Sequence, residues 1–446
     1  MAWSEVSERR WERPIDGVEG YFVYPGSASA SLCDGREHYT IFSKVQIELS
    51  IPVADVESAL KQAWLQLRYE QPLIAAKVEG MTRVYEVPDE AALQAWLTAS
   101  FVVSTAADAE ELYSSVAPIT QATFYYIPRS SEVVLRAQHY VVDGVGLLLL
   151  WDRYLSALSA PAVEAITFGD EPTRLSAPLE DILGNPGQPT PEEAEQVLEI
   201  WGKYTNNVPG IGPESDVGRV PAGKCRHTSL VLPLQTTEAI VRACKEKNIT
   251  VTSAVQAAYI QTIIKFADPN TPSSHYVSPS SFNLRRYLPH PYNTAQHAAS
   301  VLYTPIPFYL DLPASFWEIV SALNQFYRGT FGDNPAALEL VPHITRFLYA
   351  LPQSPAYQAS AIPHDALPSS LGTIEQYVQR TYGSTVTVCD LTPAMDVTLG
   401  MSSFFIYTFR DQLRVIYSFN DAYEDPADID RYLEEMQKVL AEELLA

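Results

Sequence analysis

A histidine and an aspartate four residues apart are the side chains of this sequence best placed to do chemistry. His139 and Asp143 lie between a run rich in β-branched residues, which begins at Val133, and an apolar segment from Val145 to Leu158. The first run is typical of a strand, and the second carries its large side chains at helical spacing. His139 is therefore predicted to lie where a strand gives way to a helix, with rigid elements on both sides to fix its position.

A neutral imidazole at such a junction is suited to general base catalysis. A free ring nitrogen can take the proton from an attacking hydroxyl or amine, a step worth roughly 10² to 10⁴-fold in rate. The other ring nitrogen must then be held as a donor, often by a backbone carbonyl. Gly144 follows the aspartate directly, and a glycine at that position would let the backbone turn sharply.

Two other interpretations of His139 remain open. A lone histidine at the end of a strand is most often a structural residue. A histidine and an aspartate at positions i and i+4 could also share one face of a helix and bind a metal ion. The sequence shows no second cluster of His, Cys, Asp or Glu with the spacing of metal ligands, so we predict no metal site.

The pattern His139-x-x-x-Asp143-Gly144 resembles the signature of the CoA-dependent acyltransferase superfamily. This superfamily includes chloramphenicol acetyltransferase, the plant BAHD acyltransferases and the condensation domains of peptide synthetases. The resemblance implies transfer of an acyl group from a thioester, with His139 and Asp143 as the residues of the catalytic motif and His139 as the base. In the superfamily the motif aspartate points away from the substrate and pairs with an arginine, so Asp143 is expected to brace the loop together with Gly144.

A second segment resembles the same superfamily. The run Asn283-Leu284-Arg285 matches the Asn-Leu-Arg segment whose arginine meets the motif aspartate, so the resemblance implies that Arg285 supports the site, with Arg286 as the alternative. A buried carboxylate needs such a partner, and a guanidinium offers a planar, two-pronged one. The other interpretation is a solvated pair of arginines beside a turn.

Further segments refine the resemblance. The N-terminal third, around Leu67 to Ala76, is similar to the fungal acetyltransferases of trichothecene biosynthesis and their relatives. A Ser-Leu-Gly run at Ser370 resembles a segment near the domain interface of condensation-type proteins, and Ser370 and Ser403 are candidates for oxyanion or substrate contacts. Gln138 stands where condensation domains carry a second histidine, and the BAHD Asp-Phe-Gly-Trp-Gly motif is absent, which favours a free-standing acyltransferase of the fungal type.

The amino-acid composition limits the classes of protein to which this chain can belong. The chain has 446 residues, of which 47% are hydrophobic and 19% charged, as expected for a folded protein with room for two cores. Its formal net charge of −23 argues against nucleic-acid partners, which need clustered Lys and Arg, and against an anionic membrane surface. A local basic pocket for CoA phosphates remains compatible with this charge.

The sequence also indicates a compartment. The N-terminus shows no apolar run or cleavage pattern of a secretion signal, and no apolar run reaches the length of a membrane span. Four widely spaced cysteines, Cys33, Cys225, Cys244 and Cys389, suit free thiols in a reducing cytosol. We therefore expect a cytoplasmic protein.

Hydrophobic periodicity predicts alternating strands and helices in both halves of the chain. The segment Trp11 to Val23 combines a Pro break, a Gly turn and an aromatic, strand-like end. The other expected elements of the N-terminal half are a strand over Tyr39–Leu49, a helix over Pro52–Tyr69 and an extended run over Pro72–Val78. Those of the C-terminal half are a helix over Glu192–Tyr204, a strand over His227–Leu234, a helix capped by Thr236 or Thr237 and ending at Glu246, a helix over Thr250–Phe266, a hairpin of Phe404–Phe409 and Leu413–Phe419, and a helix over Asp428–Leu444.

The region from Ser159 to Pro221 is rich in Pro and Gly and is typical of a linker. We predict an N-terminal acyltransferase-like domain at 1–175 that carries the His-Asp-Gly motif, a crossover at 176–222, and a C-terminal acyltransferase-like domain at 223–446. The fold class is α/β, with two chloramphenicol-acetyltransferase-like domains. Each is a mixed β-sheet with flanking helices, and the active-site tunnel is expected at their interface.

The resemblance implies a specific reaction. The expected function is an O-acyltransferase that moves an acyl group, acetyl first among them, from acyl-CoA to a hydroxyl of an apolar small molecule in fungal secondary metabolism. Acyl-CoA is the cosubstrate, no cofactor is permanently bound, and a monomer is the simplest expectation. Two alternatives remain: the same fold with a carrier-protein-bound acyl donor, and a cyclase, isomerase or binding protein that shapes a ligand without acyl transfer.

Overall fold

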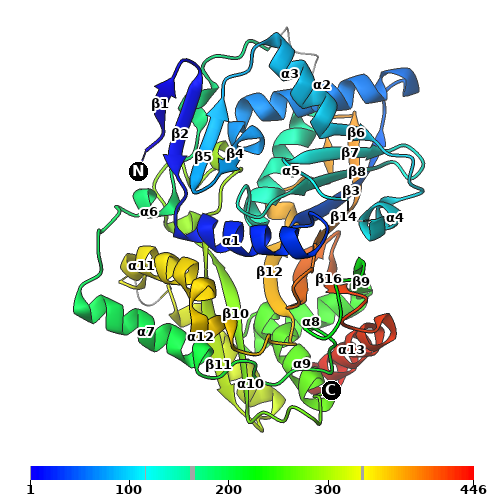
Figure 1. Cartoon of the computed structure of the whole chain (residues 1–446). Helices are drawn as coiled ribbons and strands as arrows, with labels where there is room; N and C mark the ends of the chain where they lie inside the picture. The colour runs from blue at the N-terminus through cyan, green and yellow to red at the C-terminus, as the bar shows by residue number, and fades with distance from the viewer. Residues whose placement is uncertain (1, 116, 161–165, 333–335, 446) are drawn as a thin grey trace. The chain divides into compact units, whose positions relative to one another are not determined.

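The computed structural model describes residues 2–115, 117–160, 166–332 and 336–445. Its elements, labelled in Figure 1, form two compact units built from interleaved segments. Unit 1 comprises residues 1–185, 283–303 and 374–393, and unit 2 comprises 186–282, 304–373 and 394–446. The contiguous domains at 1–175 and 223–446 stay a prediction, and so does the active-site tunnel. Unit 1 includes two segments, 283–303 and 374–393, that lie within the predicted C-terminal domain.

The core of unit 1 is a six-stranded mixed sheet in the order β13-β14-β3-β8-β7-β6. Strand β3 (Ile41–Leu49) pairs antiparallel with β8 (Glu132–Ala137), and every residue of β8 is buried. The predicted strands at Tyr39–Leu49 and after Val133 are therefore confirmed. The remaining strands are β13 (Thr381–Tyr382), β14 (Val386–Met395), β7 (Thr123–Ile127) and β6 (Phe101–Val103).

Two long helices pack beside each other in this unit. Helix α2 (Val56–Glu70) follows a 3₁₀ turn at Val53–Asp55, and α5 (Gly144–Ser159) follows the histidine motif. The Tyr154 hydroxyl of α5 donates to the Leu60 carbonyl of α2 at 3.2 Å, which ties the two helices together. The Trp151 indole donates to the Ser43 hydroxyl of β3 at 3.0 Å, which fixes α5 against the sheet. Both predicted helices are thus confirmed.

A smaller antiparallel sheet in unit 1 has the order β1-β2-β5-β4. Its strands are β1 (Ser4–Ser7), β2 (Arg10–Pro14), β5 (Thr82–Glu86) and β4 (Lys77–Glu79). The extended run predicted over Pro72–Val78 is wrong in its first half, where Pro72–Ala75 forms a 3₁₀ turn. Proline at the first position of a helical turn has a suitable φ and lacks only an N–H that would be unpaired there anyway.

The strand-like end predicted for Trp11–Val23 is also wrong. Strand β2 ends at Pro14, and α1 (Gly17–Leu32) begins three residues later. Asp16 accepts from the Glu19 backbone N–H, and the Glu19 side chain accepts from the Asp16 N–H, which makes a capping box. This local helix start outweighs the β-propensity of the aromatic residues that follow, so Phe22 lies on a helix.

A buried ion cluster anchors α1 to the small sheet. The Glu19 carboxylate accepts hydrogen bonds from both terminal nitrogens of Arg13, at 2.6 and 2.7 Å, and lies 3.6 Å from Arg83 Nη1. Burial would raise the pKa of Glu19, but the two guanidinium groups hold it below its usual value. Because each charge here is buried, the start of α1 is fixed only while the cluster is complete.

Unit 2 has a four-stranded sheet in the order β12-β15-β16-β9 and a two-stranded ribbon of β10 and β11. The hairpin predicted across Arg410 and Asp411 is confirmed, and both turn residues have positive φ, at 51° and 62°. The strands of unit 2 are β9 (Cys225–Val231), β10 (His275–Asn283), β11 (Tyr303–Asp311), β12 (Leu367–Thr373), β15 (Ser403–Phe409) and β16 (Gln412–Asn420).

All four helices predicted in the C-terminal half are present in unit 2. The helices of this unit are α7 (Pro191–Thr205), α8 (Leu234–Glu246), α9 (Val251–Lys265), α10 (Phe316–Gly329), α11 (Ala337–Ala350), the short α12 (Pro355–Gln358) and α13 (Pro426–Val439), which continues as a π-helical turn to Leu444. The cap predicted at Thr236 or Thr237 is wrong, because α8 begins before both residues. Buried Thr237 instead accepts from the Leu413 N–H at 3.0 Å and joins α8 to the sheet.

Two features bear on the expected compartment. Over the described residues, no helix combines the length and apolarity that crossing a bilayer requires. None of the four cysteines is joined in a disulfide bond.

The Glu19 cluster gives a stability prediction. Glu19→Gln should lower the free energy of unfolding by roughly 3–5 kcal/mol, because it leaves two arginines buried without a counterion. Glu57→Gln is the control, since Glu57 pairs with Lys61 at 2.6 Å on the exposed face of α2 and should cost less than about 0.5 kcal/mol. Urea unfolding followed by the circular dichroism of both variants measures the difference. Equal losses would show that the cluster does not anchor α1.

Candidate active site

His139 lies in the turn that joins the buried central strand β8 to helix α5. The strand ends at Ala137 and the helix begins at Gly144, so the histidine is held between two regular elements. Within the turn, the Val141 N–H donates to the Gln138 carbonyl at 2.9 Å. The predicted position of His139, at a junction of strand and helix, is therefore confirmed.

Two aromatic rings contact the imidazole. The Phe22 ring of α1 stacks on the His139 ring, with 4.0 Å between ring centroids and 3° between ring planes. The Tyr303 ring lies 6.0 Å away, tilted by 37°. Sequence reasoning missed both residues. The capping box at Asp16 could have predicted the helix that carries Phe22, but no local signal says which side chain that helix turns toward His139.

Burial controls the protonation of His139. Removal from solvent lowers its pKa to about 4, while the nearby backbone carbonyl of His139 itself and the Asp143 carboxylate act in the opposite direction. Nδ1 is buried and has no hydrogen-bond partner of good geometry among the described residues. The imidazole is consequently neutral at physiological pH.

Both carboxylate oxygens of Asp143 accept hydrogen bonds from groups other than His139. Arg285 Nη1 donates to both carboxylate oxygens, at 2.7 and 2.8 Å. The same oxygens accept from the backbone N–H groups of Gly146 at 2.7 Å and Leu302 at 2.6 Å. Asp143 is thus the N-cap of α5 and the partner of a buried arginine at once. The expected pairing is present, and this geometry suits a brace better than a proton carrier.

Arg285, not Arg286, is the arginine that meets the motif aspartate. Arg285 is buried and also contacts the Ser300 carbonyl through Nη2 at 3.4 Å, whereas the neighbouring Arg286 is exposed and contacts the Tyr287 hydroxyl. Because a single nitrogen reaches both oxygens of Asp143, the contact differs from the two-pronged geometry that the sequence suggested.

Gly144 does not have the structural role that was expected of it, and a different glycine, Gly146, makes the close contact. Gly144 is the first residue of α5, where its backbone is helical, so it makes no sharp turn. The close approach occurs at Gly146, which sequence reasoning missed. A Cβ there would lie 2.4 Å from the Ala298 carbonyl oxygen and 2.9 Å from Arg285 Nη2. Gly146 is therefore what lets α5 approach the segment that carries Arg285.

The rest of the histidine turn is held by two further side chains. Arg83 Nη1 donates to the Tyr140 carbonyl at 2.8 Å. The side-chain amide of Gln138 donates to the Ile119 carbonyl at 3.0 Å. The residue that replaces the second histidine of condensation domains therefore has a structural contact of its own.

Both candidate serines for an oxyanion contact lie in unit 2. Ser370, on β12, is exposed, and its hydroxyl lies 2.8 Å from that of Thr252. Ser403, on β15, is buried and donates to the Leu367 carbonyl at 3.3 Å. Their role in catalysis stays a prediction.

In the part of the chain that the structure describes, no three His, Cys, Asp or Glu side chains gather closely enough to hold a metal ion.

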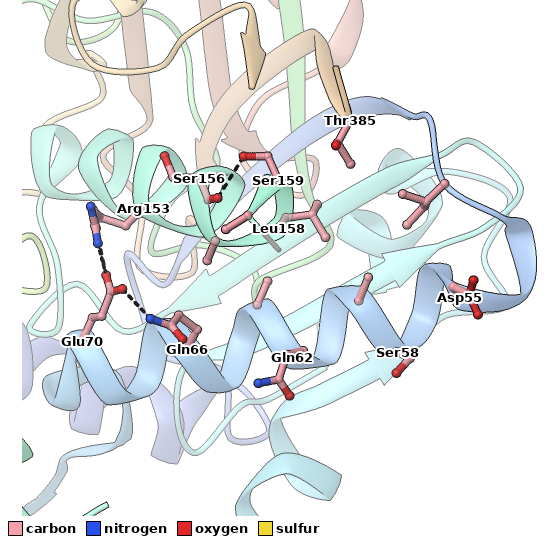
Figure 2. Close-up of a pocket in the computed structure, with 15 residues that line it drawn as sticks. Asp55, Ser58, Gln62, Gln66, Glu70, Arg153, Ser156, Leu158, Ser159 and Thr385 are labelled. Carbon is pink, nitrogen blue, oxygen red and sulfur yellow. Dashed lines mark hydrogen bonds and ion pairs between the residues drawn. The ribbon is translucent and has the colours of Figure 1, made fainter. Parts of the chain in front are cut away.

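A cavity of about 910 Å³ opens elsewhere in unit 1, between α2 and α5 (Figure 2). Its charged residues are Asp55, Glu70 and Arg153, and the last two form an ion pair at 2.6 Å. The other polar side chains are amides and hydroxyls, namely Ser58, Gln62, Gln66, Ser156, Ser159 and Thr385. This lining offers hydrogen bonds and an ion pair but neither a histidine nor a cysteine.

Comparison with known proteins indicates fungal acetyltransferases. The chain is 26% identical to the O-acetyltransferase pigM of Monascus ruber, over all of this chain and 87% of that protein. It is 27% identical to the acetyltransferase pigO of the same fungus, over all of this chain and 98% of that protein. A third relative, 26% identical over 99% of this chain and 96% of its own length, is named loline biosynthesis cluster 1 transcription factor lolU1, from Epichloe uncinata.

Solved structures support the same fold. The trichothecene 15-O-acetyltransferase TRI3 of Fusarium sporotrichioides superposes with a TM-score of 0.82 at 17% identity, covering 98% of this chain and 97% of that one. The first condensation domain of the CDA synthetase has a TM-score of 0.65 at 16% identity, with the same coverage. No protein-family model matches the chain. The predicted resemblance to the CoA-dependent acyltransferase and condensation fold is therefore confirmed, as is the mixed α/β fold class.

The Asp143–Arg285 pair gives the second prediction. Arg285→Ala should destabilise the protein by roughly 3–5 kcal/mol, because it leaves the Asp143 carboxylate buried without a counterion. Arg286→Ala, at the next position, removes an exposed side chain and should cost less than about 0.5 kcal/mol. Asp143→Asn should cost less than Arg285→Ala, since a neutral amide can still occupy the cap. Thermal unfolding of the three variants tests this order, and indistinguishable midpoints would remove the pair from the account of the site.

Proposed function

We propose that the chain is an O-acyltransferase that moves an acyl group from acyl-CoA to a hydroxyl of an apolar small molecule in secondary metabolism. One observation carries the proposal: a neutral histidine at a rigid junction, whose neighbouring aspartate is occupied by an arginine. The full-length similarity to pigM, pigO and TRI3, whose names state acetyl transfer, supports this choice over the alternatives.

The proposed step needs a single base. As the acceptor oxygen bonds to the thioester carbonyl carbon, Nε2 of His139 takes the hydroxyl proton, and the carbonyl oxygen becomes an oxyanion. Collapse of the tetrahedral intermediate breaks the carbon–sulfur bond. The leaving CoA thiolate then takes the proton back from the imidazolium, so the histidine is regenerated and no permanently bound cofactor is required.

The low basicity of His139 fits transfer that is concerted with attack. With a pKa of about 4, the imidazole is fully available at neutral pH but cannot remove a proton from a free alcohol. It accepts the proton only as the oxygen becomes acidic during bond formation.

The oxyanion needs a donor, and of the two candidate serines we favour Ser370. Its hydroxyl is exposed and its partner is another hydroxyl, that of Thr252, so it can turn toward a ligand. The Ser403 hydroxyl is buried and committed to a backbone carbonyl within the sheet.

The remaining expectations belong to the same proposal. Acyl-CoA is proposed as a soluble cosubstrate, with acetyl-CoA first among the donors. A cytoplasmic location fits the four free thiols, and a monomer remains the simplest state. The net charge of −23 argues against nucleic-acid binding of the kind that the name of lolU1 suggests.

The third prediction tests the base. His139→Ala should lower kcat by about 10² to 10⁴-fold and leave acyl-CoA affinity nearly unchanged, because the variant loses only the proton acceptor. His290→Ala is the matched control, since His290 is exposed in the same unit. Turnover by mass spectrometry and donor affinity by calorimetry separate the two effects. Undiminished turnover would end the catalytic role of His139, and joint loss of turnover and donor binding would indicate structural damage.

The same enzyme should show a characteristic pH dependence. A base must be unprotonated to act, so kcat/KM should be constant around neutral pH and fall as the pH decreases through about 4. A midpoint near 6.5, the ordinary value for histidine, would contradict a buried base.

The fourth prediction concerns the donor. Acetyl-CoA alone should support turnover, because the whole of this chain is similar to two proteins named acetyltransferases and covers 87% and 98% of their lengths. The comparison is with the same acyl group on a phosphopantetheine carrier protein, the donor of the rival with the same fold. Turnover only with the loaded carrier would favour that rival. Isomerisation of a ligand without any change in its mass would instead favour an isomerase or a cyclase.

A further inference from the structure

The orientation of His139 is not explained by the hydrogen bonds that usually fix a catalytic imidazole. In many sites a carboxylate or carbonyl accepts from one ring nitrogen and so sets both tautomer and rotamer. Here the Asp143 oxygens are occupied by Arg285, Gly146 and Leu302. Nδ1 of His139 meets no side-chain partner in the described residues, and the hydrogen-bond acceptor that raises its pKa is the backbone carbonyl of His139 itself. Something other than a side-chain hydrogen bond must hold the ring.

The Phe22 ring supplies that contact. Its plane lies within 3° of the imidazole plane at a centroid distance of 4.0 Å, so one whole face of the histidine is covered. Stacked aromatic rings attract each other beyond the area that they bury. Tyr303 approaches at 6.0 Å with a tilt of 37°, which limits rotation of the ring without covering it equally.

Phe22 is itself held rigidly. It lies three residues after Glu19 on α1, so the two side chains leave neighbouring positions on the helix surface. Glu19 is clamped by Arg13, and Arg83, which contacts Glu19, also donates to the carbonyl of Tyr140. One buried cluster therefore fixes both the helix that presents Phe22 and the residue that follows His139.

We propose that Phe22 is a positioning residue for the reaction, holding the His139 imidazole by ring stacking in place of a carboxylate. This inference rests on the proposed function for its catalytic consequence, but the stacking itself can be measured without any substrate. The aromatic face fixes the plane of the imidazole ring and keeps water off the covered face. A rotating imidazole would present Nε2 correctly for only part of the time, and small misplacements of a catalytic group are costly.

The experiment compares three variants. Phe22→Leu removes the flat ring but keeps an apolar side chain. Phe22→Tyr restores the ring and serves as the conservative rescue. Phe101→Leu is the matched control, because Phe101 lies in the same unit, has the same 6% exposure as Phe22 and stacks on Phe124 away from the histidine. Thermal midpoints check that all three variants are folded.

The kinetic readout separates positioning from packing. Phe22→Leu should lower kcat by about 10 to 10²-fold with little change in KM for acyl-CoA, as expected for a misplaced base. Its kcat/KM should also fall at higher pH than in the native enzyme, because an uncovered imidazole regains water and its pKa rises from about 4 toward 6.5. Asp143 and Tyr303, the other titratable groups at the ring, are present in every variant. Phe22→Tyr should recover most of kcat, and Phe101→Leu should match the native enzyme.

A second readout does not depend on turnover. In protein with labelled histidine, the ring protons of His139 should be shifted upfield by the phenyl face, and the signal is assigned by its loss in His139→Asn. Phe22→Leu should remove the upfield shift and raise the pKa, whereas Phe101→Leu should do neither. An unchanged His139 signal in Phe22→Leu would overturn the stacking, even if the chain proved to transfer no acyl group. A changed signal with native kcat would overturn the catalytic consequence, provided that the native enzyme is active.

Discussion

The buried ion pair between Asp143 and Arg285 is the interaction on which the rest of the site depends. Its members lie 142 residues apart in the sequence, and the carboxylate also caps α5 and accepts from the Leu302 backbone. A buried carboxylate is tolerated only when such partners are complete, so the segment 283–303 must be present in unit 1 for the motif to fold. The presence of segment 283–303 in unit 1 agrees with this requirement.

Because both oxygens of Asp143 are occupied by structural hydrogen bonds, the carboxylate does not accept a hydrogen bond from His139. A carboxylate that accepts from the imidazole would raise the pKa of His139, as in a Ser-His-Asp triad. Here burial dominates and lowers that pKa to about 4. The ring is thus neutral under physiological conditions, and one of its faces packs against the Phe22 ring.

The similar solved structures share one fold but are named for different reactions. Superposition on TRI3 with a TM-score of 0.82, and on a condensation domain with 0.65, shows one architecture shared by an acetyltransferase and a condensation domain. The reaction of this chain must therefore be argued from its own side chains. The occupied Asp143, the neutral His139 and the structural contact of Gln138 are the particular features that bear on that choice.

The sequence alone determined the local features of this protein. The β-branched run before His139, the helical spacing after it and the Asn-Leu-Arg resemblance were enough to predict β8, α5 and the pairing of Asp143 with Arg285. Tertiary structure decided the rest. Phe22 and Tyr303 contact His139 only because a helix and a strand distant in sequence dock there, Gly146 is required only because Ala298 and Arg285 approach it, and the pKa of His139 depends on solvent exclusion. Such contacts arise from packing between elements, and neither propensity nor spacing along the chain encodes them locally.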